Sequence, residues 1–307
     1  MKRNKEEEED EDPSMTQELQ KQTQAHYDQY PFIEGGPNRI AWWREYLRDF
    51  LPDSSLRDRL VVDIGSGIGE IARGLADRGA RMVCVDVSRQ SLARCREINP
   101  EADIYHGTAL SLPFMDNTFD CLICIGVLHH TPDCRKGFRE ASRVLAPGGI
   151  FVLFLYNWWN VYNAIYHAFK PVRTLMPLER VPRFVVRLLQ PFAKKHLGQP
   201  LDDWQLRRLL GDKLWTPQAS FHSIRQIRRW GMEEGLTMTG YKRFYLGYAN
   251  VMKLVKNGAA ENGGHRRVRV RCARWGQGPM TRNEATYACT CGHSYLLKEG
   301  IWGCMPE

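Results

Sequence analysis

The feature that most constrains the fold is a short hydrophobic run that ends in three closely spaced glycines. Residues 60–64, LVVDI, have the composition of a buried strand, and the sequence GSGIG follows at positions 65–69. In α/β folds, a strand that runs into such a loop delivers the chain to the carboxyl edge of a sheet, where ligands bind. Glycine permits a tight turn and a close approach of backbone to ligand. The run therefore predicts a nucleoside-type binding site.

Strand-like and helix-like stretches alternate around this loop. Strands are predicted at 60–64, 81–87, 103–106, 119–125 and 150–156, with helices at 70–77, 89–98 and 134–145. Such alternation is typical of right-handed crossovers in a parallel sheet covered on both faces. The sequence thus predicts an α/β fold with a doubly wound, mostly parallel sheet. Further elements are expected as helices at 15–30, 40–50 and 223–234, and strands at 238–245 and 249–255.

Composition divides the chain into three parts. An acidic run near the start predicts a disordered tail over residues 1–14. Residues 15–257 are expected to form the main domain, and a glycine-rich linker then opens a small module at 258–307. Residues 158–216, the helical insertion, interrupt the alternation with periodic aromatic and apolar residues. A structureless loop of that length is uncommon, so this segment is predicted to be an inserted helical lid.

The chain is basic, with a formal net charge of +8 over 307 residues. The positive charge is concentrated at 170–229 and 265–271, which would meet phosphate groups, an anionic membrane or only water. Residues 146–169 contain no Asp, Glu, Lys or Arg, but three asparagines within them favour a buried strand and helix over a membrane span. No apolar segment follows the first basic residues, so a cytoplasmic protein is expected. The oligomeric state stays open.

Two acidic positions distinguish between nucleotide ligands. A dinucleotide-binding loop has its third glycine where Glu70 stands, and a carboxylate there would repel a pyrophosphate. S-adenosylmethionine has no phosphate, and its ammonium and sulfonium groups tolerate Asp63 and Glu70 as neighbours. Asp86 ends the second predicted strand, where a carboxylate accepts hydrogen bonds from ribose hydroxyls. This spacing favours S-adenosylmethionine.

Three further stretches resemble the class I S-adenosylmethionine-dependent methyltransferases, in particular the group with quinone and small-molecule methylases. They are GTALSLPFMDNTFD at 107–120, GVLHHTPD at 126–133 and REASRVLAPGG at 139–149. The resemblance covers about residues 58–157 and implies a Rossmann-like fold. It also implies the cofactor-binding residues Asp63, Gly65, Ser66, Gly67, Gly69, Asp86, Val87, Thr108, Ala109, Leu110 and Ile125. Many members have an acid at the position of Thr108, whose hydroxyl oxygen still accepts a hydrogen bond.

Methyl transfer requires alignment and, where the acceptor carries a proton, a general base. His129 and His130 follow the fourth predicted strand and are the nearest titratable candidates for a catalytic role. A purely structural role for both histidines is the alternative. His26, Tyr27 and Tyr30 belong to an N-terminal helix that, by the resemblance, folds over the cofactor, although a merely packed helix is an equal alternative.

Four of the nine cysteines lie near the C-terminus: Cys272, Cys289, Cys291 and Cys304. In a protein expected to be cytoplasmic, this grouping favours metal over disulfides. The segment is similar to the small zinc ribbon of some methyltransferases, which implies zinc ligation by these cysteines. Trp275 stands where a partner of Cys272 is expected, so Cys304 or His293 would have to complete the usual four ligands. A metal-free ribbon is the alternative.

The leading hypothesis is methyl transfer from S-adenosylmethionine to a small hydrophobic, aromatic or lipid-like acceptor beneath the helical insertion. A nucleic-acid methyltransferase that uses the basic surface and the ribbon is the first alternative, although the sequence shows no acceptor motif of the base-modifying enzymes. A non-catalytic cofactor-binding partner is the second. The aromatic residues and arginines of the insertion also leave peripheral membrane contact open.

Overall fold

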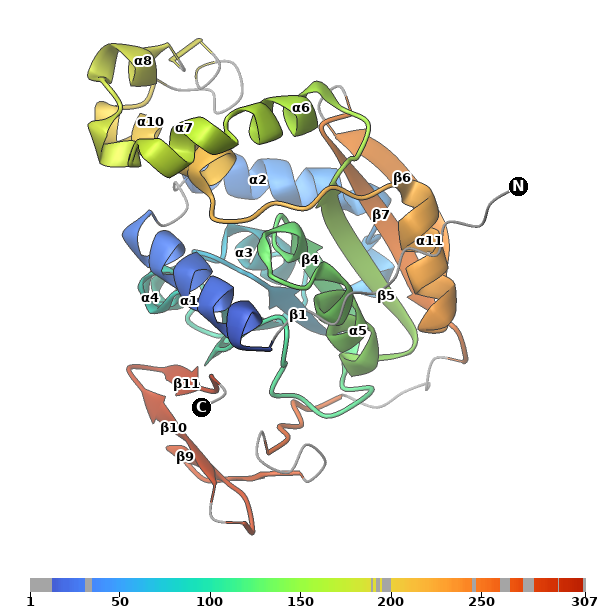
Figure 1. Ribbon diagram of the computed structural model, residues 1–307. Helices are drawn as coiled ribbons and strands as arrows, with labels where there is room; N and C mark the ends of the chain where they lie inside the picture. Colours follow the sequence, from blue (N-terminus) through green and yellow to red (C-terminus); the bar gives the residue numbers. More distant parts are fainter. Residues whose placement is uncertain are drawn as a thin grey trace.

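The computed structural model describes residues 13–30, 35–188, 190, 191, 194, 200–244, 247–259, 266–272, 279–291 and 293–305. The first twelve residues of the predicted acidic tail and Trp275 of the ribbon lie outside this part. Within it, one eleven-stranded sheet has the order β6-β7-β5-β4-β1-β2-β3-β11-β10-β9-β8. Figure 1 shows the central strands with helices on both faces, and β9, β10 and β11 at the lower end of the molecule.

The central strands are parallel and are joined by helices. The strands are β1 (Leu60–Ile64), β2 (Arg81–Asp86), β3 (Asp103–His106), β4 (Phe119–Ile125) and β5 (Leu145–Tyr156). The crossover helices are α3 (Glu70–Ala76), α4 (Arg89–Ile98) and α5 (Cys134–Val144), and the short helix η3 (Leu128–His130) follows β4. The predicted doubly wound α/β fold is therefore confirmed. The strand β5 begins earlier than predicted because Leu145 already pairs with Phe119 ahead of a bulge.

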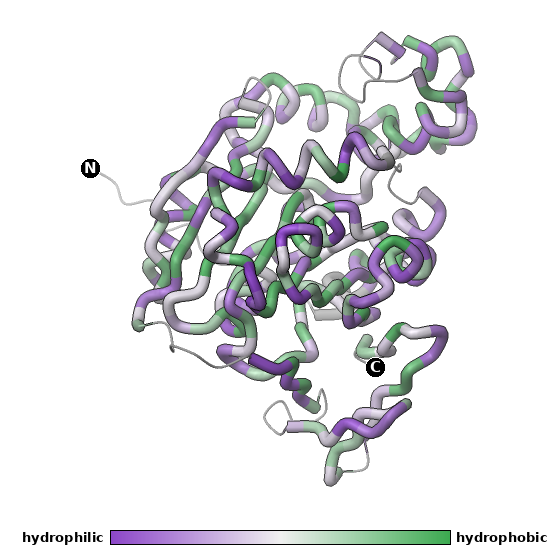
Figure 2. Tube along the Cα trace, turned by 180° about the vertical axis from the view of Figure 1, so that it is seen from behind, coloured by the Kyte–Doolittle hydropathy of each residue, from purple (hydrophilic) through white to green (hydrophobic). Residues whose placement is uncertain are grey.

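Two hydrophobic cores lie on opposite faces of the sheet. Successive side chains of a strand point to opposite faces, so Val61 and Val62 belong to different cores. On one face, Val62 packs in the core that includes Phe138 of α5 and Trp230 of α11 (Ile224–Glu233). On the other face, Val61 packs with Leu75 of α3. Figure 2 shows the hydrophobic strands between the more hydrophilic helices.

An antiparallel hairpin closes one edge of the sheet. The strands β6 (Leu236–Phe244) and β7 (Ala249–Lys256) pair with each other, and β7 also pairs with β5. At the start of the chain, α1 (Pro13–Gln29) and α2 (Gly36–Tyr46) are followed by the short helices η1 (Leu47–Asp49) and η2 (Asp53–Ser55). Figure 1 shows α1 beside α4, and α2 packs against α3.

The helical insertion contains α6 (Val161–Ala168), α7 (Lys170–Leu175), η4 (Leu178–Arg180), α8 (Arg183–Arg187), α10 (Asp203–Leu210) and the π-helical turn η5 (Gly211–Trp215). It has a small core of its own, which includes Val186, Leu206 and, from the end of α1, Tyr30. Across the described residues, every helix is too short or too polar to cross a membrane.

The C-terminal strands extend the sheet instead of forming a detached module. They are β8 (Thr281–Arg282), β9 (Thr286–Ala288), β10 (Ser294–Lys298) and β11 (Ile301–Gly303). β11 pairs in parallel with β3, so that Trp302 lies opposite Tyr105. The Trp302 side chain is 2% exposed, and its ring centroid lies 4.5 Å from that of Tyr287. The edge strand of the main sheet is thereby covered.

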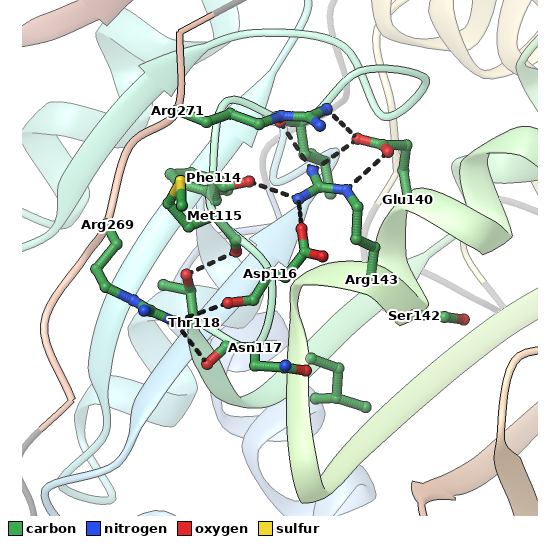
Figure 3. A network of polar contacts seen from close by, with 12 residues as sticks. Phe114, Met115, Asp116, Asn117, Thr118, Glu140, Ser142, Arg143, Arg269 and Arg271 are labelled. Atoms are coloured by element: carbon green, nitrogen blue, oxygen red, sulfur yellow. Dashed lines mark hydrogen bonds and ion pairs between the residues drawn. The ribbon is translucent and has the colours of Figure 1, made fainter. Parts of the chain in front are cut away.

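The basic segment before these strands is engaged within the molecule (Figure 3). Arg271 pairs with Glu140 of α5 at 2.8 Å, and Arg269 donates to the Asp116 carbonyl oxygen at 2.7 Å. Arg266 pairs with Asp120 at 3.0 Å. The sequence suggested a phosphate-binding, membrane-binding or solvated basic face here. In the structure, carboxylates and carbonyl oxygens of the main domain bind these three arginines, and Arg269 is also exposed to solvent.

Candidate active site

A cavity of about 280 Å³ opens at the carboxyl edge of the sheet. Its floor is made by the ends of β1, β2, β4 and β5, and α1, α2 and η5 supply further walls. The strand order reverses between β1 and β4, and such a switch point is where α/β sheets bind ligands. Nine of the eleven predicted cofactor residues line this cavity, namely Gly65, Ser66, Gly67, Asp86, Val87, Thr108, Ala109, Leu110 and Ile125.

The glycine loop is held in a shape that other residues rarely adopt. Gly65 has a φ of +70°, and a Cβ atom there would lie 2.2 Å from Cγ2 of Val127. Gly67 has a φ of +54°, and its N–H donates to Oδ2 of Asp86 at 2.8 Å. Between them, Ser66 has a buried Oγ atom without a hydrogen-bond partner among the described residues. The loop thus presents mainly its backbone to the cavity.

Asp86 ends β2 at the base of the cavity. Its Oδ1 accepts a hydrogen bond from the Ser88 N–H at 2.8 Å. Burial raises the pKa of Asp86 above its ordinary value, while the N–H groups of Ser88 and Gly67 oppose that rise. Thr108 also lines the cavity and follows β3, whose last residue pairs with Asp86, and its Oγ1 accepts from the Leu110 N–H at 3.2 Å. Asp86 and Thr108 therefore both line the cavity.

Two predicted cofactor residues lie behind the glycine loop instead of in the cavity wall. Asp63 is 2% exposed within β1, and burial together with Asp86 raises its pKa to about 7. Gly69 begins α3 with a φ of +80°, and its carbonyl accepts from Asn99 Nδ2 at 2.9 Å. Both residues support the loop. The sequence placed both residues at the glycine loop but did not predict that they lie behind it.

The two adjacent histidines differ in position. His130 lines the cavity, and its Nδ1 lies 2.8 Å from the Gln218 carbonyl oxygen, which can only accept. Nε2 is thus left to accept from the Tyr156 hydroxyl at 3.2 Å. Burial lowers the pKa of His130 to about 4. His129 does not line the cavity. Its ring lies 3.7 Å from that of Tyr156, and burial lowers its pKa well below the ordinary value.

Aromatic side chains wall the part of the cavity beyond the glycine loop. They are Tyr27 of α1, Trp43 of α2, Phe154 and Tyr156 of β5, Phe244 of β6, and Tyr248. The ring centroids of Phe154 and Phe244 are 5.2 Å apart, and those of Tyr156 and Tyr248 are 4.9 Å apart. Only Tyr27 among these residues was singled out from the sequence. The others come from a helix, two strands and a turn, and their aromatic residues are indistinguishable from ordinary core residues in the sequence.

An ion pair from the helical insertion completes this aromatic part. Lys213 Nζ lies 2.7 Å from Oδ2 of Asp212 and 5.5 Å from the ring centroid of Tyr248. Burial would lower the pKa of Lys213, but Asp212 together with the hydroxyls of Tyr248 and Tyr162 raises it well above the ordinary value. Burial would likewise raise the pKa of Asp212, but Lys213 together with His130 and His26 lowers it below the ordinary value. Both groups are therefore charged. Their turn is π-helical, a form that often occurs at functional sites.

The N-terminal helices are tied to the glycine loop and to the insertion. Glu70 lines the cavity, forms an ion pair with Arg39 of α2 and accepts from the Gly35 N–H at 2.7 Å. Tyr30 hydrogen-bonds to Glu179 of the insertion. These contacts hold α1 and α2 beside the cavity, to which they contribute Tyr27, Arg39 and Trp43.

A second cluster of chemically active side chains lies among the C-terminal strands. The Sγ atoms of Cys272, Cys289 and Cys291 all lie within 4.8 Å of one another, and those of Cys272 and Cys291 are 3.6 Å apart. Cys304 is not part of the group. It directly follows β11, and its N–H donates to the His106 carbonyl at 2.8 Å, which fixes it on the main sheet. Cys304, which the sequence predicted as a fourth metal ligand, therefore lies apart from the other three cysteines.

Comparison with known proteins identifies the central part of the chain. Residues 62–153 match the family model described as a methyltransferase domain. Demethylmenaquinone methyltransferase of Renibacterium salmoninarum is 24% identical over 219 residues, which are 71% of this chain and 83% of that enzyme. The 2-methyl-6-phytyl-1,4-hydroquinone methyltransferase of Arabidopsis thaliana is 29% identical over 209 residues, 65% of this chain and 55% of the plant protein.

Solved structures align over a similar part of the chain. A methyltransferase from Mesorhizobium loti aligns with 71% of this chain and 98% of its own, at 17% identity and a TM-score of 0.48. The family match covers the glycine loop and the ends of β2 and β4, whereas the aromatic residues that line the cavity lie outside it. The prediction of a methyltransferase domain is confirmed over residues 62–153.

Proposed function

We propose that this chain, an S-adenosylmethionine-dependent methyltransferase, methylates a small acceptor that has an aromatic ring with a hydroxyl group, of the reduced-quinone type. The observation that carries this proposal is the aromatic wall of the cavity, interrupted by only a few polar groups. Flat rings stack favourably against such side chains. The names of the bacterial and plant relatives, which refer to menaquinone and hydroquinone substrates, support the same class of acceptor.

The residues of the cofactor half fit the methyl donor. Asp86 is placed at the base of the cavity to accept hydrogen bonds from ribose hydroxyls. Ala109, Leu110 and Ile125 offer an apolar surface to a purine ring. When bound, S-adenosylmethionine supplies an electrophilic methyl group attached to a sulfonium.

His130 and Lys213 would act on the acceptor. The Gln218 carbonyl fixes the Nδ1–H tautomer of His130, so Nε2 would accept the proton of the acceptor hydroxyl once that hydroxyl replaces the Tyr156 hydroxyl as its hydrogen-bond donor. Removal of the hydroxyl proton makes the acceptor ring more nucleophilic, and the Lys213 ammonium stabilises the negative charge that develops there. Asp212 keeps this ammonium in place.

The cofactor half is tested by calorimetry with S-adenosylmethionine. We expect Asp86→Asn to weaken binding at least about tenfold, because a charge-assisted hydrogen bond contributes roughly 1.5–3 kcal/mol. The matched control is Asp49→Asn, which changes an exposed carboxylate outside the cavity. Equal affinity of the wild type and Asp86→Asn would contradict the assignment of Asp86.

The acceptor is tested by mass spectrometry of reaction products. Short-chain hydroquinones, aromatic amines and an RNA fragment are offered separately with the methyl donor. Methylation of the hydroquinone is expected. Methylation of RNA alone would overturn the proposal, and methylation of amines alone would change its acceptor class.

We further infer that Cys272, Cys289 and Cys291 hold a structural zinc ion. With Zn–S bonds of about 2.3 Å, tetrahedral geometry places two sulfurs about 3.8 Å apart. The distance of 3.6 Å between Cys272 and Cys291 fits this value. Nε2 of His293 is buried without a hydrogen-bond partner among the described residues, but it lies outside the group of three sulfurs, so its side chain would have to turn toward them to be the fourth ligand.

A further inference from the structure

Large apolar side chains are exposed mainly on the helical insertion. The described part of the chain has fifteen exposed large hydrophobic residues, and eleven of them lie between positions 158 and 204. The most exposed are Trp159 at 83%, Leu175 at 82%, Val161 at 75%, Leu188 at 74% and Phe184 at 70%. A surface helix normally presents polar residues to water. This concentration of exposed apolar residues therefore indicates a surface that binds a membrane or another molecule.

The exposure is not a by-product of an unpacked segment. In α8, Val186 is fully buried in the core of the insertion, while its neighbours Phe184 and Val185 are exposed. In α10, Leu206 is buried and Trp204 is 52% exposed. The helices thus have an apolar inner side and further apolar residues outside. Figures 1 and 2 show α8 and α10 in a lobe at one corner of the molecule, with hydrophobic and hydrophilic segments interleaved.

The charge of the helical insertion indicates what kind of partner its exposed apolar residues bind. Residues 158–216 contain ten Lys and Arg against four Asp and Glu. Arg187 already pairs with Asp203 at 2.8 Å, while Lys170 and Arg180 are exposed beside the apolar residues. Exposed Trp, Phe and Leu together with Lys and Arg are typical of segments that lie in the interface of an anionic membrane. A purely apolar protein groove would leave these cations without counter-charge.

The same segment also forms part of the cavity wall. α10 continues directly into η5, which contributes Asp212 and Lys213 to the cavity. The Tyr162 hydroxyl of α6 donates to the Lys213 carbonyl oxygen, which links the exposed helices to that turn. A surface bound through the insertion would therefore lie close to the site of methyl transfer.

We propose that the helical insertion attaches the enzyme to the surface of an anionic lipid bilayer, from which a lipophilic acceptor enters the cavity. The attachment stands on the exposed residues of the insertion, and only the entry of the acceptor rests on the proposed function. Apolar side chains enter the headgroup region, and the neighbouring cations bind anionic lipid headgroups.

Co-sedimentation with lipid vesicles tests the attachment. The wild type is expected to bind vesicles that contain phosphatidylglycerol, and to bind pure phosphatidylcholine at least about tenfold more weakly because the cations contribute. The double variant Trp159→Ser/Leu175→Ser should lose at least about tenfold in binding. The matched control is Met232→Ser, which changes a residue of α11 that is 72% exposed outside the insertion.

Three outcomes would overturn the proposal. They are a wild type that does not bind anionic vesicles, a double variant that binds as well as the wild type, and a self-association in light scattering that the double variant abolishes without any vesicle binding. Turnover of a short-chain, water-soluble hydroquinone is measured in parallel and is expected to be unchanged in the double variant. A wild type that binds vesicles but methylates no hydroquinone would contradict the proposed function and leave the attachment standing.

Discussion

Asp63 is a carboxyl group inside the sheet, and its environment makes stability depend on pH. Burial and Asp86 raise its pKa from an ordinary value near 4 to about 7. The folded protein therefore holds this proton up to a higher pH than the unfolded chain. As pH rises from about 4 to about 7, Asp63 costs stability at about 1.4 kcal/mol per pH unit.

Asp63→Asn removes this titration. We expect the free energy of unfolding of the variant, relative to the wild type, to increase between pH 4 and pH 7 and to be constant above that range. Urea unfolding at a series of pH values measures the difference. Asp49→Asn is the control, because that carboxylate is exposed. Parallel pH curves for wild type and Asp63→Asn would show that the buried carboxyl group titrates normally.

His130 is the residue on which proton removal depends in the proposed mechanism. We expect His130→Gln to lower kcat at least about a hundredfold with hydroquinone, the usual loss for a general base, without changing the affinity for the methyl donor. Because the pKa of His130 is about 4, wild-type turnover should vary little between pH 6 and pH 8. Tyr156→Phe, which keeps the ring but removes the hydroxyl, should have a smaller effect. An undiminished kcat in His130→Gln would exclude it as the base.

For single residues, the sequence predicted the cofactor-binding part of the cavity better than the part that would bind the acceptor. Nine positions of the glycine loop and strand ends line the cavity because local turns and strand ends fix them. His129 and His130 are neighbours in one short helix, and only tertiary packing decides which of them faces the cavity. Asp212 and Lys213 have no motif, since their position depends on the path of the whole insertion.

Among the elements, the π-helical turn η5 brings the ion pair of Asp212 and Lys213 to the cavity, with side chains 16% and 31% exposed. Lys213→Met should lower kcat/KM for hydroquinone about tenfold or more and reduce stability by about 1–3 kcal/mol, because Asp212 loses its partner. The double variant Asp212→Asn/Lys213→Met should recover most of the stability but not the activity. Kinetics and thermal unfolding separate the two effects. Recovery of activity in the double variant would assign the pair a structural role.

The C-terminal strands carry the predicted zinc site. Elemental analysis of the purified protein should find one zinc per chain, and Cys291→Ser should lose it, because a structural site needs its thiolates. Cys304→Ser is the matched control: it changes a buried thiol outside the cluster and should keep the metal. Absence of zinc from the wild type, or its retention in Cys291→Ser, would refute the site.

Most helices and strands of the main domain were predictable, because the spacing of hydrophobic residues and the glycines in turns indicate where each begins and ends. The strands β1, β3 and β4 begin and end as predicted. The pairing of β11 with β3 was not predicted. The two strands are far apart in the sequence, and neither contains a pattern that indicates with which strand it pairs. The sequence thus suggested a separate module where the structure has an extension of the sheet.

For the molecule as a whole, Trp302 joins the C-terminal strands to the main core. Its side chain packs with Tyr105 of β3 and Tyr287 of β9. Trp302→Ala should lower the free energy of unfolding by about 3–5 kcal/mol, the usual cost of truncating a buried aromatic residue. Leu296→Ala, at a position that is 51% exposed, should change it by less than about 0.5 kcal/mol. Similar losses in both variants, measured by urea unfolding, would contradict the shared core.

The pairing of β3 with β11 also has a consequence for how the chain folds. Ile104 and Ile301 are partners in this pairing, although nearly two hundred residues separate them. Contacts between such distant positions form slowly, because the entropy lost in closing the loop comes before the contacts that offset it. Until β11 arrives, β3 is an open strand edge to which a second unfolded chain can add. Refolding yield should therefore fall as protein concentration rises, and a synthetic peptide with the sequence of β10 and β11 should restore part of it.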